Sequence, residues 1–264
     1  MAGSRGKADD SARKISDASR LTMAIDLNYC QNCGSALARG KNYCSHCGQE
    51  ARTSRLTLTQ LWHDLLHALT HVDRSVLSLL RPLLIWPGYV ARDYVEGKRK
   101  RYFRPLSWLV VIVGLVSAEV VVSGFHVAIA NNPSPLLNVL QRHVNLVFLF
   151  QVPLLALFCR LLFWRDGFNS AEFLVLAAYT VSVRTLFFGV VLVPLSSIFH
   201  PSPTAQVFAA YASFIVWAVY FGFAASQFST RGRTVASFKG VLAAILTQAA
   251  TQAMASFAAT LWFR

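Results

Sequence analysis

Five long apolar runs fill the chain from residue 105 to residue 264 and restrict its fold more than any other feature. The bilayer core offers no hydrogen-bonding partners, so a lipid-exposed run of about 20 apolar residues is confined to a helix that satisfies its own backbone. We therefore predict an all-α membrane protein whose domain at 105–264 is a five-helix transmembrane bundle. The predicted spans are 106–129, 144–163, 173–195, 208–227 and 238–262. Charged residues make up only 14% of the sequence, against about a quarter in soluble domains, which agrees with this class.

A basic cluster marks the junction between the polar N-terminal part of the chain and the first predicted span. Five cations lie here within seven residues, namely Lys98, Arg99, Lys100, Arg101 and Arg104. Such a cluster is held on the cytoplasmic side of a membrane, because anionic lipid head groups attract it and because its translocation is costly. No apolar segment typical of a signal peptide occurs before Cys30. The N-terminus is accordingly predicted to be cytosolic.

The rest of the charge sets the predicted orientation and disfavours nucleic acid as a partner. Residues 1–104 hold 17 Lys and Arg against 9 Asp and Glu, which leaves 8 against 3 for the remaining chain. A net charge of +13 would suit nucleic acid in a soluble protein, but here it is concentrated beside the membrane and favours anionic lipid. Arg165, Arg231, Arg233 and Lys239 follow even-numbered spans, whereas the opposite loops, 130–143 and 200–206, hold only one basic residue of this kind, Arg142. Five spans with the more basic loops in the cytosol place the C-terminus on the opposite side of the membrane.

Two short cysteine motifs predict a zinc ribbon at residues 28–52, after a polar tail at 1–27 that is predicted to be disordered. In each motif a tight turn directs two thiolates toward one metal ion, and two motifs complete a tetrahedral Zn²⁺ shell. The predicted ligands are Cys30, Cys33, Cys44 and Cys47. Four thiolates leave no open position for water, so the single zinc ion is predicted to be structural. A redox dithiol and two disulfides are the alternatives, which the doubled motif and the cytosolic placement disfavour.

A metal-stabilised segment as small as this ribbon usually presents a surface to something else. We expect it to dock a cytosolic protein or to regulate the membrane domain. A purely structural clip is the alternative, because nothing in the motif itself identifies a partner.

Residues 53–104 are predicted to hold amphipathic and interfacial helices together with the basic junction. Apolar residues recur at helical spacing over 58–80, and the charged residues and histidines between them keep this helix at the membrane surface. His63, His67 and His71 follow at i, i+4 and i+8 on that helix. This stripe is either a solvated polar face or, for its first two members, part of a metal site.

Three short patterns in the first part of the chain carry a family resemblance. They are C-x-N-C-G at 30–34, Y-C-x-x-C-G-Q at 43–49, and G-K-R-K-x-Y-x-x-P at 97–105. In this order, with an amphipathic helix between the second and the third, they resemble a bacterial family of unknown function that joins an N-terminal zinc ribbon to a polytopic membrane domain. The resemblance covers residues 28 to about 110. It implies a bacterial inner-membrane protein, in which the predicted orientation makes the C-terminus periplasmic, and it brings no catalytic residue with it.

Two charged residues interrupt the predicted spans, where charge is expensive. Glu119 in the first span and Arg184 in the third are predicted to lie at similar depth, so that they could pair. Gln151, Gln248 and Gln252 fall in nearly the same layer. This polar layer is either a site for a polar or lipid substrate or a structural device, an ion pair with amide cross-links that fixes the register of the helices.

Two classes of function are compatible with these features. The first is a non-enzymatic membrane protein whose ribbon is a docking or regulatory module. The second is a transporter or lipid-handling protein that uses the layer at Glu119 and Arg184. An enzyme is disfavoured, because the sequence contains no nucleophile elbow, H-E-x-x-H motif, P-loop or acidic dyad. The last span, rich in Ala, Ser, Thr and Gln, is expected to pack inside the bundle or across a homo-oligomer interface.

Overall fold

A computed structural model describes residues 29–38, 40–51, 53–68, 76–125, 147–199 and 201–262 of the protein. The predicted tail at 1–27, the loop between the first two spans, His71 and the side chain of His67 lie outside the described residues. The chain divides into two compact units. The smaller consists of Met1–Arg55 and Gly97–Arg101, and the larger of Leu56–Glu96 and Tyr102–Arg264.

The smaller unit contains the predicted ribbon and four of the five basic residues of the junction. Its described backbone has no helix and is held by turns and by two isolated antiparallel bridges, Tyr29 with Ala36 and Tyr43 with Glu50. Sequence reasoning assigned residues 98–101 to the segment at 53–104. The structure instead groups Gly97–Arg101 with the ribbon, whereas Arg104 belongs to the larger unit.

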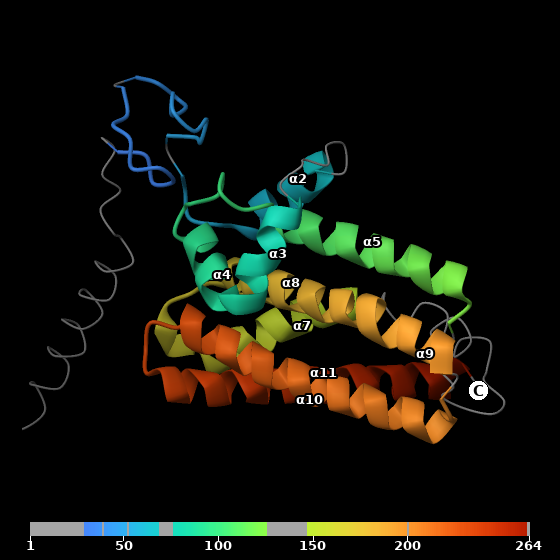
Figure 1. Ribbon diagram of the computed structural model, residues 1–264. Coiled ribbons are helices and arrows are strands. Elements are labelled where there is room, and N and C mark those ends of the chain that lie inside the picture. The colour runs from blue at the N-terminus through green and yellow to red at the C-terminus, as the bar shows by residue number, and fades with distance from the viewer. Residues whose placement is uncertain are drawn as a thin grey trace, which may run out of the picture. The chain divides into compact units, whose positions relative to one another are not determined.

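The larger unit is all-helical (Figure 1). Its short N-terminal helices are α2 (Leu58–Ala68), α3 (Val76–Ile85) and α4 (Pro87–Val95). The longer helices are α5 (Pro105–Ser123), α7 (Val147–Leu162), α8 (Ser170–Phe187), α10 (Pro203–Phe228) and α11 (Arg233–Trp262). A 3₁₀ turn, η2 (Trp164–Asp166), follows α7, and a π-helical turn, η3 (Phe188–Leu192), joins α8 to α9 (Val193–Phe199).

Four helices in the described chain are long and apolar enough to cross a membrane. They are α5, the continuous run from α8 through α9, α10 and α11, and each overlaps one of the predicted spans. The second predicted span, 144–163, corresponds to α7, which is apolar but only 16 residues long. The predicted all-α class agrees with the structure, which has four long apolar helices and a four-cysteine cluster near its N-terminus. By helix length and composition the described residues hold four candidate spans, against the five that were predicted.

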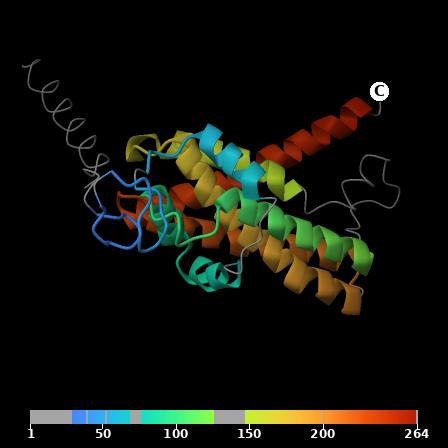
Figure 2. The same ribbon diagram turned by 90° about the horizontal axis from the view of Figure 1, so that it is seen from above.

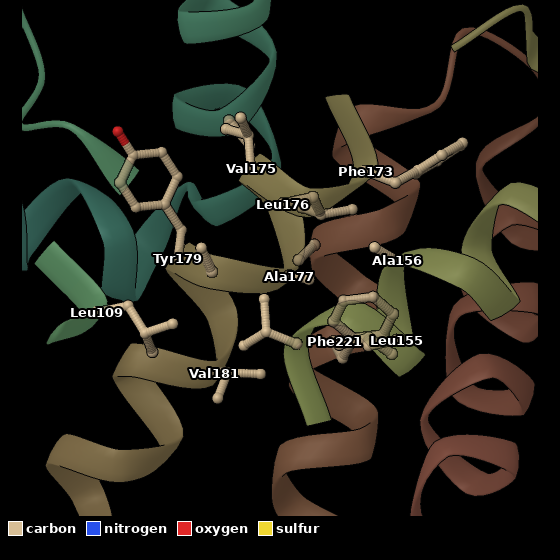
Figure 3. Close-up of a cluster of buried hydrophobic side chains, with 14 of the residues drawn as sticks. Leu109, Leu155, Ala156, Phe173, Val175, Leu176, Ala177, Tyr179, Val181 and Phe221 are labelled. Carbon is tan, nitrogen blue, oxygen red and sulfur yellow. The ribbon is translucent and has the colours of Figure 1, made fainter. Parts of the chain in front are cut away.

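Helix α8 forms the centre of the larger unit. It begins with a capping box, in which the Asn169 side chain accepts from the Glu172 N–H at 2.9 Å and the Glu172 carboxylate accepts from the Asn169 N–H at 2.7 Å. Every residue from Val175 to Ser182 is buried, since α5, α7, α4 and α10 all contact this helix. Figure 3 shows Val175, Leu176 and Val181 within the resulting core. A helix covered by neighbours needs no solvated polar face, and the buried hydroxyls of Thr180, Ser182 and Thr185 donate to carbonyls of α8 itself.

Helices α10 and α11 approach each other closely through small residues, as is common where helices pack within membranes. An added Cβ atom at Gly240 would lie 2.7 Å from the Ala225 Cβ atom and 2.9 Å from the Gly222 Cα atom. Figure 1 shows the two helices side by side over much of their length. The last part of α11, residues 252–257, is exposed in the described chain, and Figure 2 shows this end of the helix diverging from the others.

The N-terminal helices of the larger unit pack on its bundle. The predicted amphipathic helix at 58–80 corresponds to α2 and the start of α3, with residues 69–75 outside the described part. Within α2 the side chain of Leu61 is buried while Trp62 and His63 are exposed, which is the pattern of an amphipathic helix. Helix α4 is fixed to α10 by a hydrogen bond from the Gly88 N–H to the Gln227 side chain at 3.0 Å.

Candidate functional site

The two cysteine motifs fold into two equivalent knuckles. In the first, the Gly34 N–H donates to the Cys30 carbonyl at 2.8 Å, and the Cys30 N–H donates to the Ser35 carbonyl at 2.8 Å. The second repeats this pattern, from Gly48 to Cys44 at 2.9 Å and from Cys44 to Gln49 at 2.8 Å. Both glycines have positive φ angles, 73° and 69°, a conformation that L side chains rarely adopt. The C-x-x-C-G spacing therefore determines the turn geometry locally.

The knuckles bring together the four sulfur atoms predicted to bind zinc. All four Sγ atoms lie within 4.8 Å of one another. Cys30 Sγ is 3.5 Å from Cys47 Sγ, and Cys33 Sγ is 3.7 Å from Cys44 Sγ. A tetrahedral zinc ion with Zn–S bonds of about 2.3 Å separates its sulfur ligands by about 3.8 Å. A disulfide would instead require about 2.05 Å. The arrangement thus fits a four-thiolate metal site and not the two disulfides that were the alternative.

The four thiols differ in their surroundings. Cys30 and Cys44 are buried and Cys33 is exposed. Hydrogen bonds from Ser35 lower the pKa of the Cys33 thiol to about 6, whereas burial raises the pKa of the Cys30 thiol to about 11. A bound Zn²⁺ ion would supply the positive charge that deprotonates the buried thiols, so all four residues would act as thiolates. Because the protein would fill all four positions, the metal would hold the fold together and would not activate water.

One buried side chain, that of Gln49, links the ribbon to the basic junction. Its Nε2 atom donates to the Gly97 carbonyl at 2.7 Å, and its Oε1 atom accepts from the N–H groups of Arg99 and Lys100 at 3.1 and 3.2 Å. Gly97 has a φ angle of 107°, and an added Cβ atom there would collide with the Gln31 Oε1 atom. Residue-by-residue reasoning missed this clamp. Its only signal was the Gln that ends the second motif.

The intramembrane residues predicted to form a polar layer are only partly brought together. Arg184 on α8 donates to Gln151 Oε1 at 2.7 Å and to Gln248 Oε1 at 3.5 Å, and Gln151 also donates to Gln248 at 3.2 Å. The guanidinium carbon of Arg184 lies 4.5, 4.9 and 5.6 Å from the ring centroids of Trp217, Phe148 and Phe214, respectively. Amides from α7 and α11 and aromatic rings from α7 and α10 therefore surround this cation.

Glu119 and Gln252 lie away from this cluster. Within the described residues no ion pair joins Glu119 to Arg184. The Glu119 carboxylate instead lies beside Gly189 in the π-helical turn, where an added Cβ atom would approach its Oε2 atom to 2.8 Å. Gln252 on α11 is exposed. Equal depth along neighbouring helices did not bring these residues together, because the direction in which each side chain projects also has to match.

The other predicted site residues show no further metal centre. Among the residues that the structure describes, the four cysteines form the only group placed to hold a metal ion. His63 is exposed on α2, and the rest of the histidine stripe lies outside the described side chains. Cys159 on α7 is buried in the bundle core, as expected for an inert thiol.

Comparison with known proteins yields one match. The model of a family described as "Protein of unknown function (DUF3667)" matches residues 73–116, which cover α3, α4 and the first part of α5. No curated protein and no solved structure matches the chain. The match agrees with a resemblance to a family of unknown function, and it lies outside the cysteine motifs.

Proposed function

We propose that this chain is a non-enzymatic, five-span protein of a bacterial inner membrane whose cytosolic zinc ribbon serves as a docking module. Four of the five spans follow from helix length and composition. The fifth is α7, whose 16 residues extend about 24 Å at a rise of about 1.5 Å per residue. A helix of this length can cross a core of about 30 Å if the bilayer thins or if its flanking residues extend to the interface.

The direction of the helices supports a crossing by α7. At the end of α7, the ring centroid of Phe163 lies 5.8 Å from that of Phe173 near the start of α8. At the start of α7, the ring centroid of Phe148 lies 5.8 Å from that of Phe188, just beyond the end of α8. Helix α7 therefore runs antiparallel to α8 and covers the same depth. Helix α10 also runs antiparallel to α8, with Phe228 beside Phe173. Alternating directions for α7, α8, α10 and α11 place the basic turns at 165 and 231 at one end of the bundle, the end that the positive-inside rule assigns to the cytosol.

The single observation that carries the docking proposal is a pair of exposed tyrosines on the ribbon. Tyr29 and Tyr43 precede the first cysteine of their knuckles, occupy equivalent places in the two antiparallel bridges, and are 55% and 64% exposed. Tyrosine is enriched at protein interfaces because it provides a large, rigid contact area with a polar end. A unit held together by four thiolates has no need of these rings for its own core. They are therefore the surface that a cytosolic protein would contact.

Photo-crosslinking in cells tests this function. A photoreactive residue at position 43 should capture one defined cytosolic protein, and the same residue in a Cys44→Ser background should not, because that variant lacks the folded ribbon. Equal capture in both backgrounds would contradict docking by the folded module. Capture of only this protein's own membrane domain would make the ribbon an internal regulator.

Transport or lipid handling through the bundle is the second candidate. One observation favours it, namely that Arg184 has no carboxylate partner within the described residues, so its charge is available to an anionic ligand. The hydrogen bonds to Gln151 and Gln248 favour a structural role instead. Transport of an anion should be lost in Arg184→Gln while the protein still accumulates, and transport that survives this change would exclude the site.

A further inference from the structure

A cavity of about 200 Å³ opens at the end of the bundle where α7 stops and where α10 turns into α11. Two segments that are distant in sequence form the cavity. The first is residues 163–166, and the second is the turn at 229–232 together with the first two turns of α11. They are joined by a hydrogen bond from the Ser229 hydroxyl to the Asp166 carboxylate. The cavity thus belongs to the packed bundle and does not depend on an unsupported loop.

Positive charge dominates the lining. It includes three cations, Arg165, Arg231 and Lys239, against one carboxylate, Asp166, so its net formal charge is +2. The Asp166 side chain is only 2% exposed and is already engaged, by Ser229 and by the Arg231 guanidinium at 3.8 Å. The exposed charge of the cavity is therefore cationic.

Two of these cations are held by aromatic rings. The Arg165 guanidinium carbon lies 4.8 Å from the centroid of Trp164, and the Lys239 ammonium lies 5.4 Å from the centroid of Phe163. Neither has a carboxylate within ion-pair distance among the described residues. A ring positions a cation without replacing the oxygen acceptors of its N–H groups. Both groups accordingly keep donors for an anion.

The cavity lies where the apolar helices end, which is the level of lipid head groups. Trp164, which lies in sequence between the lining residues Phe163 and Arg165, is 62% exposed, as expected of an interfacial ring, and Val235 and Ala236 add apolar groups to the lining. We propose that this cavity binds a phosphate group, with Arg165 and Lys239 as its donors and an anionic phospholipid as its source. A free phosphate compound has the same chemistry and is distinguished below.

Gly232 offers a variant that changes charge without disturbing the fold. It lines the cavity, an added Cβ atom there would meet nothing within 4 Å, and its carbonyl accepts the first helical bond of α11 from the Ala236 N–H at 3.1 Å. It is thus the N-cap of α11, a position where Asp and Asn are equally favourable. Gly232→Asp places a carboxylate at the cavity, and Gly232→Asn is its neutral, isosteric control.

Native mass spectrometry of the full chain in detergent micelles that contain phosphatidylcholine, with added phosphatidylglycerol, tests the proposal. Wild type and Gly232→Asn should retain one phosphatidylglycerol per chain. Each basic residue near an anionic group contributes about fivefold in binding, so the double variant Arg165→Gln/Lys239→Gln should bind it about 25-fold more weakly. Gly232→Asp should also lose it.

Inorganic phosphate separates the two sources. If inorganic phosphate leaves the retained phosphatidylglycerol in place, the phospholipid is the ligand, and if inorganic phosphate displaces the phosphatidylglycerol from wild type, a free phosphate compound is the ligand. Equal retention by all four proteins would overturn the proposal, since general attraction to a basic surface would then explain the binding. Lack of both lipid retention and a phosphate effect in wild type would overturn it as well.

Discussion

Replacement of Gln49 by Ala should detach the basic junction from the ribbon without unfolding the ribbon. The buried side chain makes three hydrogen bonds to the backbone of residues 97–100. At about 1 kcal/mol of net stabilisation for each bond, the clamp contributes about 3 kcal/mol. This corresponds to a change of roughly 100-fold in the opening equilibrium of the segment. A structural zinc ion in a small domain contributes about 10–16 kcal/mol, so the knuckles should stay closed.

Hydrogen exchange at a single amide reports this change. The Arg99 N–H also contacts the Gly97 carbonyl at 2.9 Å, whereas the Lys100 N–H donates to Gln49, so Lys100 is the cleaner probe. In Gln49→Ala the Lys100 amide should exchange roughly 100-fold faster than in wild type, with one zinc ion still bound. The neighbouring exposed residue provides the control, Glu50→Ala, which should leave the exchange rate unchanged. Unchanged protection of Lys100 in Gln49→Ala would refute the clamp.

Three further substitutions test the ribbon, the helix packing and the polar cluster. Cys44→Ser should release the zinc ion, as measured by metal analysis, and leave the thermal unfolding of the membrane unit unchanged, because the metal stabilises only the ribbon. Gly240→Leu should force α10 and α11 apart and destabilise the bundle by about 1–3 kcal/mol in detergent unfolding, whereas Gly114→Leu, which faces open space, should not. Gln151→Leu should cost about 1–3 kcal/mol because it removes a 2.7 Å acceptor of the buried guanidinium on α8, and Gln252→Leu, at an exposed position, should have little effect.

The features that the sequence predicts best are those whose geometry is local. The spacing of Cys30 and Cys33, and of Cys44 and Cys47, determines a turn with two sulfur atoms on one side, so the four-cysteine cluster follows from two short motifs. Helices of membrane length are also predictable from local sequence, because an apolar run of about 20 residues in lipid satisfies its backbone hydrogen bonds within its own helix. Neither prediction requires knowledge of how the helices pack.

The features that the sequence predicts poorly depend on rotation of the helices about their axes. Similar depth makes an ion pair of Arg184 with Glu119 possible, yet the partners of Arg184 are two glutamines, because α7 and α11 place their amides on the side that α8 presents. The cation–π contact with Trp217 comes from α10 and left no pattern in the sequence. The Gln49 clamp joins residues far apart in the chain, and the Gln that ends the second motif does not indicate which backbone atoms it binds.

Two exposed positions distinguish the five-span topology from a four-span alternative. Thr204 lies at the start of α10, and Thr230 lies in the turn before α11, so the length of α10 separates them. If α7 crosses, Thr204 is periplasmic and Thr230 is cytosolic. If α7 only enters the membrane and returns, every later helix is inverted and the two positions exchange sides.

Cysteine labelling with a membrane-impermeant maleimide decides between these cases. In intact spheroplasts Thr204→Cys should react and Thr230→Cys should not, and after permeabilisation both should react. In intact spheroplasts the native thiols give little background, because the ribbon cysteines would be cytosolic in both topologies and Cys159 is buried. The positive-inside rule predicts the first pattern, since the inverted arrangement would expose the cations at 231, 233 and 239 to the periplasm. Labelling of Thr230→Cys from outside would remove α7 from the spans and move the phosphate cavity to the outer leaflet.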